Sequence, residues 1–329
     1  MKNKTGLSFL LSFLLLIFFQ INAFAEQPQF SFSFTPQAGF LNGKIIENVW
    51  YANEKITPTS KIYTPADKMS RLDWYMENVP FVGAELDFLF NNKYSFLFSF
   101  KNAFAGDCGK MEDFDWLNPI DWPKDPADEL TNYSKHTNIL HNYTQATINF
   151  GRHFYLGKNK NISLIPRFGF QTETISFSGF GGWMTYKTYN WKIMSFEETD
   201  VISYKQTFIA PILSFNADFN FARYFEINTG ISAVWISTLN CCDIHHVKKE
   251  LYNDRIKDAW KLGAELAAFF KINQLSKVGF KGDVSYIPDA YGFTYSSETA
   301  KLPSMGVPPS LGGTSRFMWS YSISLSLHL

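Results

Sequence analysis

The C-terminal segment 319–329 alternates strictly between large apolar and small polar side chains. A β-strand points successive side chains to opposite faces, so this segment has one apolar face and one polar face. That pattern is typical of transmembrane β-barrels, whose strands face lipid outside and a polar interior. Such a sheet must close on itself, because lipid cannot satisfy the backbone groups of an open edge. The apolar positions are Trp319, Tyr321, Ile323, Leu325, Leu327 and Leu329, and the polar ones are Ser320, Ser322, Ser324, Ser326 and His328.

The same period of two recurs from the N-terminal half of the chain onward. Segments 30–34 and 94–100 place Phe or Tyr at every second position. Segment 254–272 is rich in Ala and Leu and could be read as a helix. Most of its apolar residues nevertheless keep one parity from Trp260 to Ile272, opposite Lys261, Gly263, Glu265 and Lys271, which favours a strand.

Turn signals divide the chain into strands. Short turns are predicted at Asn91-Asn92, at 157–160, near Ala222-Arg223 and at 273–276. Longer loops are predicted at 51–68, 106–140, 179–198 and 296–313, with one more around the second polar cluster described below. The sequence therefore predicts an all-β fold, a ten-stranded antiparallel transmembrane β-barrel with five long extracellular loops and short periplasmic turns.

Composition supports a barrel and excludes other classes. There are 34 Phe, 16 Tyr and 9 Trp, yet no later apolar run is long enough for a membrane helix, so the aromatics fit the girdles of a barrel. Lys plus Arg and Asp plus Glu both number 30, so no charge excess would recruit nucleic acid. Cys108, Cys241 and Cys242 do not form a disulfide framework, which needs an even and larger number.

The N-terminus has the features of an export signal. Lys2 and Lys4 precede an apolar run over 7–19, and Ala23-Phe24-Ala25 offers a small-x-small cleavage site. The run is shorter than a spanning helix, although an uncleaved anchor is the alternative. We expect residues 1–25 to be a cleaved signal peptide and residues 26–329 to form a single outer-membrane barrel domain.

Two polar clusters are candidates for a site. Asp113 and Asp115 lie two positions apart and share one face of an extended segment, as do Asp243 and His245. Four such groups converging on one water would form a hydrolytic constellation. Two alternatives stay open at this point. The aspartates could be solvated loop acids, and segment 241–246 contains a plausible ligand set for Zn²⁺.

Six stretches resemble the omptin family of outer-membrane proteases, in the same order and from the first strand to the last. Three of them correspond to the family patterns Ser-x-Leu-Asp-Trp, Met-x-Asp-x-Asp-Trp and Asp-x-His. The resemblance implies an endopeptidase in the outer membrane whose groove opens at the cell surface. The stretches are Gly43–Val49, Ser70–Trp74, Met111–Trp116, Ser134–His136 with Asn142-Tyr143, Ile202–Gln206 and Asp243–His245.

The resemblance also implies catalytic roles for four residues. Asp243 would orient His245, and His245 and Asp113 would hold the attacking water between them. Asp115 is a like charge beside Asp113, so one of the two aspartates would keep a proton and donate it to the developing oxyanion. This chemistry requires no metal and no covalent acyl-enzyme.

Substrate contacts follow from the same resemblance. Glu47 matches the first of two acids that select a basic residue before the cut, but the second acid falls at Cys241. We therefore expect a weakened preference for basic residues. Met111 and Ile202 match apolar walls beyond the cut, and His136 is expected to support the groove.

The resemblance makes a requirement for lipopolysaccharide doubtful. Family members bind this lipid on the outer wall through an aromatic residue, a Glu, two Arg and a Lys. Here only the ring and the Lys remain, so we expect weak dependence and no other cofactor. The matching positions are Phe170, Thr172, Thr174, Thr207 and Lys257.

Two other functions compete with a protease. A barrel that had lost proteolysis could act as an adhesin or structural surface protein, but it would have no physical need for all four catalytic residues. A porin is disfavoured, because side chains largely fill a barrel of ten strands. The expected partners are peptide or protein substrates and outer-membrane lipid, and we expect a monomer. The natural substrate does not follow from the sequence.

Overall fold

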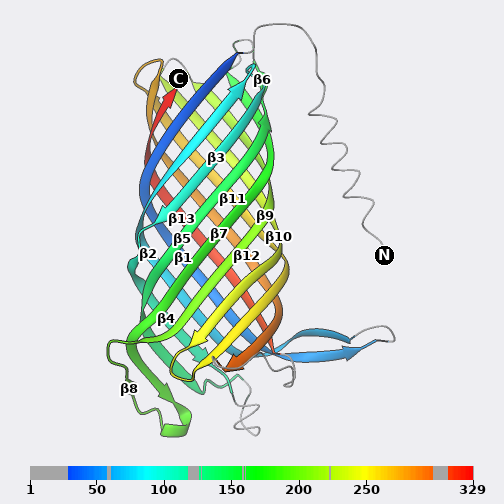
Figure 1. Ribbon diagram of the computed structural model, residues 1–329, viewed down its shortest axis with the longest axis vertical. Coiled ribbons are helices and arrows are strands. Elements are labelled where there is room, and N and C mark those ends of the chain that lie inside the picture. The colour runs from blue at the N-terminus through cyan, green and yellow to red at the C-terminus, as the bar shows by residue number, and fades with distance from the viewer. Residues whose placement is uncertain are drawn as a thin grey trace.

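The computed structural model describes residues 29–57, 61–117, 126, 128–157, 159, 161–221, 224–298 and 310–328. Nearly all of these residues lie in antiparallel strands (Figure 1). The elements are β1 (Phe30–Ile56), β2 (Lys61–Phe90), β3 (Tyr94–Ala103), β4 (Gly106–Asp115), β5 (Asn132–Arg152), β6 (Phe154–Leu156), β7 (Ile162–Tyr186), the short helix η1 (Lys187–Tyr189), β8 (Met194–Ser195), β9 (Asp200–Phe221), β10 (Phe225–His245), β11 (Glu250–Lys271), β12 (Ser276–Glu298) and β13 (Leu311–His328).

The strands form one closed ring. β1 pairs with both β2 and β13, so the first and last strands seal the sheet. β3 and β4 lie end to end between β2 and β5, β6 extends β5, and β8 is a two-residue pairing on β7. The thirteen described strand segments therefore occupy ten strand positions around the barrel. The predicted ten-stranded antiparallel barrel is confirmed. The described part of the chain has no helix long and apolar enough to cross a membrane.

The two ends of the barrel differ. We call the end that carries β8 and the long connections the loop end, and the opposite end, near the C-terminus, the turn end (Figure 1). At the turn end Asn91 and Asn92 both have φ near 50°, as a tight hairpin turn with two left-handed residues requires, so this predicted turn is confirmed.

The outer wall is apolar toward the turn end and polar toward the loop end. This places the membrane band at the turn end and leaves the loop-end rim outside it. Exposed apolar residues of the band include Phe170, Ile209, Ile231, Leu266, Phe280 and Ile323. Nearer the loop end the outward positions include Lys135, Lys205, Arg255 and Lys257.

Several strands extend far into the segments that the sequence predicted as loops. β4 and β5 occupy most of segment 106–140, and β7 continues to Tyr186. Segment 51–68 continues β1 and β2 as a hairpin that projects sideways from the loop end (Figure 1). Those loop predictions were wrong because a rim strand above the lipid has no apolar outer face, and its alternation disappears. The predictions for residues 1–25, Ala222-Arg223 and most of 296–313 lie outside the described residues.

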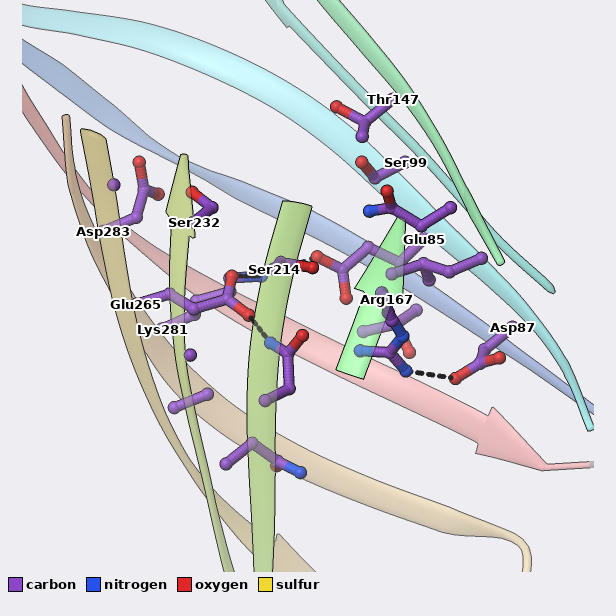
Figure 2. Close-up of a pocket in the computed structure, with 18 of the residues that line it drawn as sticks. Glu85, Asp87, Ser99, Thr147, Arg167, Ser214, Ser232, Glu265, Lys281 and Asp283 are labelled. Carbon is purple, nitrogen blue, oxygen red and sulfur yellow. Dashed lines mark hydrogen bonds and ion pairs between the residues drawn. The ribbon is translucent and has the colours of Figure 1, made fainter. Parts of the chain in front are cut away.

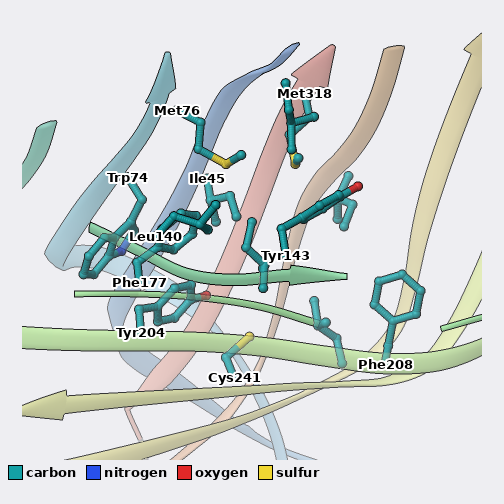
Figure 3. Packing of buried hydrophobic residues seen from close by; sticks show 14 of the residues in the cluster. Ile45, Trp74, Met76, Leu140, Tyr143, Phe177, Tyr204, Phe208, Cys241 and Met318 are labelled. Carbon is teal, nitrogen blue, oxygen red and sulfur yellow. The ribbon is translucent and has the colours of Figure 1, made fainter. Parts of the chain in front are cut away.

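A packed apolar layer fills the interior below the loop-end rim (Figure 3). Trp74 stacks between Phe177 and Tyr204, with ring centroids 5.7 Å apart on each side. Ile45 and Met318 add side chains from β1 and β13. On the turn-end side lies a polar cavity of about 470 Å³ lined by charged side chains (Figure 2). The layer separates this cavity from the rim, as expected of a filled barrel rather than a diffusion pore.

Candidate active site

The first pair of acids lies on β4, between β2 and β5. Asp113 is opposite Leu72 on one side and Ser134 on the other. Ser70 Oγ donates a hydrogen bond to Asp113 Oδ1 at 3.3 Å, and Asn132 Nδ2 donates to Asp115 Oδ2 at 3.0 Å. Both aspartates line the same cavity, as the period of a strand requires.

The second pair lies near the end of β10. His245 Nε2 is 2.7 Å from Asp243 Oδ2. A carboxylate only accepts hydrogen bonds, so Nε2 carries the proton and Nδ1 is the basic nitrogen of the neutral ring. Tyr252 packs edge-on against this imidazole, with centroids 5.2 Å apart. The ring is therefore held in one orientation by a carboxylate and an aromatic neighbour.

The two pairs meet across a small cavity at the loop end. Asp113, Asp115 and His245 all line it, although β4 and β10 belong to well-separated walls of the barrel. Val201 and Ile202 of β9 form an apolar part of the lining. The cavity measures about 40 Å³, and a water needs roughly 10–15 Å³ by the same kind of measure, so ordered water fits between the pairs.

The pKa values of Asp113 and His245, on opposite sides of this cavity, are both raised. Burial raises the pKa of Asp113 well above its ordinary value, and the Asp115 carboxylate raises it further. Burial lowers the pKa of His245, but the Asp243 carboxylate outweighs burial, so the net shift is upward. A raised carboxyl pKa opposite a strengthened imidazole base is the arrangement that general acid–base chemistry uses.

The residues expected to select the substrate lie deeper in the barrel interior, farther from the loop end than Asp243 and His245. Glu47 on β1 and Cys241 on β10 are 2 % and 3 % exposed. Gln206 Nε2 donates to Thr314 Oγ1 at 2.7 Å, bridging β9 and β13 across the interior. Glu47 pairs in register with Thr314, and Cys241 pairs with Gln206. The hydrogen bond between Gln206 and Thr314 therefore brings Glu47 and Cys241 to the same level of the barrel interior.

The remaining predicted contacts are buried in the walls. Met111 is fully buried, and Ile202 is 4 % exposed at the edge of the cavity. His136 is enclosed between the Gly181 carbonyl at Nδ1 and Ser134 Oγ, which is 2.8 Å from Nε2. Burial lowers the pKa of His136, so it is a neutral residue that fixes the wall rather than a surface contact.

The positions matched to lipid binding lie on the outer wall, and Lys257 is the only charged residue among them. Thr174 Oγ1 and Thr207 Oγ1 are 3.0 Å apart, and Thr172 donates to the Phe208 carbonyl at 3.1 Å. Phe170 is 63 % exposed beside them. Lys257 lies on β11, separated from β9 by β10. The threonine hydroxyls are thus engaged with one another and with the backbone.

Two charged residues of this region were missed from the sequence. Lys248, in the turn after β10, lines the same cavity as the aspartates. Burial lowers the pKa of Lys248, but Asp115 and Asp113 raise it more, so it stays a cation beside them. Asp254 on β11 lies opposite Cys241. Asp254 could have been identified as the partner of Cys241 only by predicting a turn at 246–249 between the two strands, and the sequence does not show that turn clearly.

The alternative of a zinc site is disfavoured by strand geometry. Cys241 and His245 point into the barrel, whereas His246 is exposed and hydrogen-bonds Ser203 Oγ at 2.7 Å. Neighbouring strand residues cannot ligate one ion from opposite faces. Across the described residues, no group of three or more His, Cys, Asp or Glu side chains is placed to hold a metal.

A closed barrel with an apolar band and a carboxylate–histidine site at one rim defines a class, the outer-membrane β-barrels with a polar rim site. The Omptin family model matches residues 29–305, so the chain belongs to the omptin family, as its motifs predicted. No curated protein sequence matches the chain.

One solved structure, an outer membrane protease, agrees with this assignment at the level of the fold. The outer membrane protease OmpT from Escherichia coli is 18% identical with a TM-score of 0.78, covering 94% of this chain and 99% of that one. The transport unit of the autotransporter AIDA-I from Escherichia coli is 9% identical, with a TM-score of 0.34 and coverages of 92% and 93%. OprG from Pseudomonas aeruginosa is 10% identical, with a TM-score of 0.34 and coverages of 90% and 95%. The chain is thus an outer-membrane barrel with the fold of an outer-membrane protease.

Proposed function

We propose that this omptin is an endopeptidase that hydrolyses peptide bonds with a water held between His245 and Asp113. One observation carries the proposal. Asp113, Asp115 and His245 come from separate walls and line one water-sized cavity. Half-buried carboxylates and a histidine that face one another across space for water have no role in closing a sheet.

The chemistry follows from the hydrogen bonds. His245 Nδ1 takes a proton from the water as it attacks the peptide carbonyl, and the Asp243 carboxylate stabilises the imidazolium that forms. The Asp113–Asp115 pair keeps a proton, which it donates in a hydrogen bond to the developing oxyanion. The imidazolium then protonates the leaving amine, which restores the neutral ring.

The proposal includes an orientation and a substrate preference. We place the loop end at the extracellular surface and the tight turns in the periplasm, so substrates are peptides or unfolded protein segments outside the cell. Glu47 at the pocket floor favours a basic residue before the cut. Ile202 at the edge of the cavity forms the apolar side beyond the cut, and the buried Met111 and His136 support the wall there.

We further propose that the protein works as a monomer and depends weakly on lipopolysaccharide. Thr172, Thr174 and Thr207 are uncharged, so they offer no charge to lipid phosphates. Their hydroxyls are also hydrogen-bonded within the barrel wall. An adhesin made from the same barrel would gain nothing from two carboxylates and a histidine that face one another across a shared cavity.

A direct test is to incubate the refolded barrel with a peptide mixture and sequence the products. We expect cleavage by the wild-type protein, enriched after Arg and Lys. The variant His245→Ala should abolish the cuts, whereas His246→Ala, on the opposite face of the strand, should retain them. Cuts that persist in His245→Ala would refute the proposed chemistry.

A further inference from the structure

Asp254 is a buried acid beside the position where the expected second pocket acid is missing. It is 4 % exposed and pairs in register with Cys241, across the β10–β11 ladder. Cys241 carries no charge, because burial and the neighbouring Asp254 carboxylate raise its thiol pKa well above the ordinary value. The expected position of the acid and an acid that is present therefore lie opposite each other on adjacent strands.

The Asp254 side chain reaches from β11 to Gly312 on β13. A Cβ built on Gly312 of β13 would come within 2.2 Å of the Asp254 carboxylate, so the carboxylate fills the space that a side chain there would take. Gly312 pairs in register with Val49 of β1, two residues from Glu47. The Asp254 charge is accordingly one of those that raise the pKa of Glu47, after burial and Asp243.

Both acids are left without a counter-charge. Glu47 Oε2 and Asp254 Oδ1 are buried with no hydrogen-bond partner among the described residues. A buried carboxylate without a partner is costly, and the pKa of Asp254 rises to about 7 as a result. An entering guanidinium or ammonium would relieve that cost on both sides of the floor.

We propose, on the basis of the peptidase function above, that Asp254 supplies the second negative charge of the pocket that selects the residue before the cleaved bond. The acid is displaced by one strand, from position 241 on β10 to position 254 on β11. A guanidinium entering the floor meets Glu47 from β1 and Asp254 from β11. Selectivity for basic residues is therefore that of a two-acid pocket, although Cys241 is neutral.

Two peptides that differ only in arginine or citrulline before the cut isolate this charge recognition, since citrulline is the neutral isostere of arginine. In Asp254→Asn the ratio of kcat/KM for the two peptides should fall by roughly tenfold or more, the scale of one charge-assisted contact. Asp258→Asn is the matched control, because Asp258 is an exposed acid on the same strand. An unchanged ratio in Asp254→Asn, alongside a collapsed ratio in Glu47→Gln, would overturn the role of Asp254 and leave the peptidase function standing.

Binding of benzamidine gives a readout that needs no turnover. Its dissociation constant should rise by about tenfold in Asp254→Asn and stay at the wild-type value in Asp258→Asn. Gly312→Ala keeps Asp254 in the chain but places a methyl group where the carboxylate lies, so it should weaken benzamidine in the same way. Wild-type affinity in both altered pockets would overturn the proposal. Cleavage of neither peptide by wild-type protein would instead refute the peptidase function, and benzamidine would still decide the role of Asp254.

Discussion

The turn-end cavity and the loop-end pocket both hold carboxylates inside the barrel, but they treat the charge in opposite ways. In the turn-end cavity, Lys281 Nζ lies 2.6 Å from Glu85 and 2.9 Å from Glu265 (Figure 2). Lys101 Nζ lies 2.9 Å from Asp283. Each acid that lines this cavity has a cation or an amide donor within hydrogen-bond distance. The charges there are balanced by the protein itself.

The acids of the loop-end pocket are not held in ion pairs with Lys or Arg in the described part of the chain, although Lys248 lines the same cavity as Asp113 and Asp115. Among the described residues, Glu47, Asp113 and Asp254 form no ion pair with Lys or Arg, and Asp243 is paired only with His245. Balanced charges hold walls together, whereas unbalanced buried charges lower stability and persist where a ligand or a reaction uses them. The two regions thus differ in whether their acids are held in ion pairs with Lys or Arg, which fits the proposed role of the loop-end acids in a reaction or in substrate binding.

The largest expected difference is in catalysis. Replacing Asp113 or His245 by Ala should leave a folded barrel and lower kcat by about 10²–10⁴-fold, the usual contribution of a general acid or base. Glu112→Gln is a matched control on the other face of β4, where Glu112 accepts from Tyr133 Oη at 2.9 Å. Steady-state cleavage of one arginine peptide measures all three. Loss of activity in Glu112→Gln equal to that in Asp113→Ala would break the distinction between the two faces.

The balanced region should respond in stability instead. Lys281→Met removes the cation between Glu85 and Glu265 and leaves both carboxylates facing each other. Since these side chains retain some contact with the cavity, we expect a loss of about 1–3 kcal/mol, below the range for fully buried pairs. Thermal unfolding in detergent measures this, with Lys55→Met in the exposed hairpin as control. An unchanged melting temperature would show that the turn-end pairs do not hold the barrel together.

The pH dependence of the rate tests the state of His245. The Asp243 carboxylate raises the pKa of His245, and the ring must be neutral to act as base, so activity should rise with pH through a value above 6.5. Asp243→Asn should move that rise to lower pH, since the charge that raises the pKa of His245 is lost. A citrulline peptide keeps the titration of Glu47 and Asp254 out of the profile. A rate that is flat from pH 5 to 8 would exclude His245 as the base.

The fold could be predicted from the sequence where the outer face of a strand contacts lipid. Segment 319–329 must show apolar residues to the membrane and small polar ones to the interior, so its alternation is visible in the sequence. The rim strands are wet outside and carry functional side chains inside, so Asp113 and Asp243 appeared to lie in loops. The structure places both in paired strands.

The candidate site was predictable only within single strands. Asp113 with Asp115, and Asp243 with His245, follow from the period of two and from family motifs. Asp254 and Lys248 depend on the position of the β10–β11 turn, because register decides which residues of two strands lie side by side. A Cys at position 241 suggested a lost charge, and only the strand register shows that the acid Asp254 lies opposite Cys241.

The smallest expected effect is a gain in stability from removing an unbalanced acid. The folded barrel raises the pKa of Asp254 from 3.8 to about 7, with Glu47, Cys241 and Asp243 as the titratable groups facing it. A raised carboxyl pKa means that the folded state loses stability as pH rises from the unfolded value through about 7, and the loss is complete above that. At about 1.4 kcal/mol per pH unit, the Asp254 charge costs up to about 4 kcal/mol at pH 8, whereas a buried unsatisfied amide costs about 1–3 kcal/mol.

Asp254→Asn should therefore be more stable to unfolding than wild type at pH 8, by about 1 kcal/mol, and have a slightly higher melting temperature. At pH 4 it should melt no higher than wild type, because Asp254 in the folded wild-type protein and Asn in the variant are then both neutral. Asp258→Asn should show no such pH-dependent difference. A lower melting temperature for Asp254→Asn at pH 8 would place Asp254 with the balanced acids of the turn end.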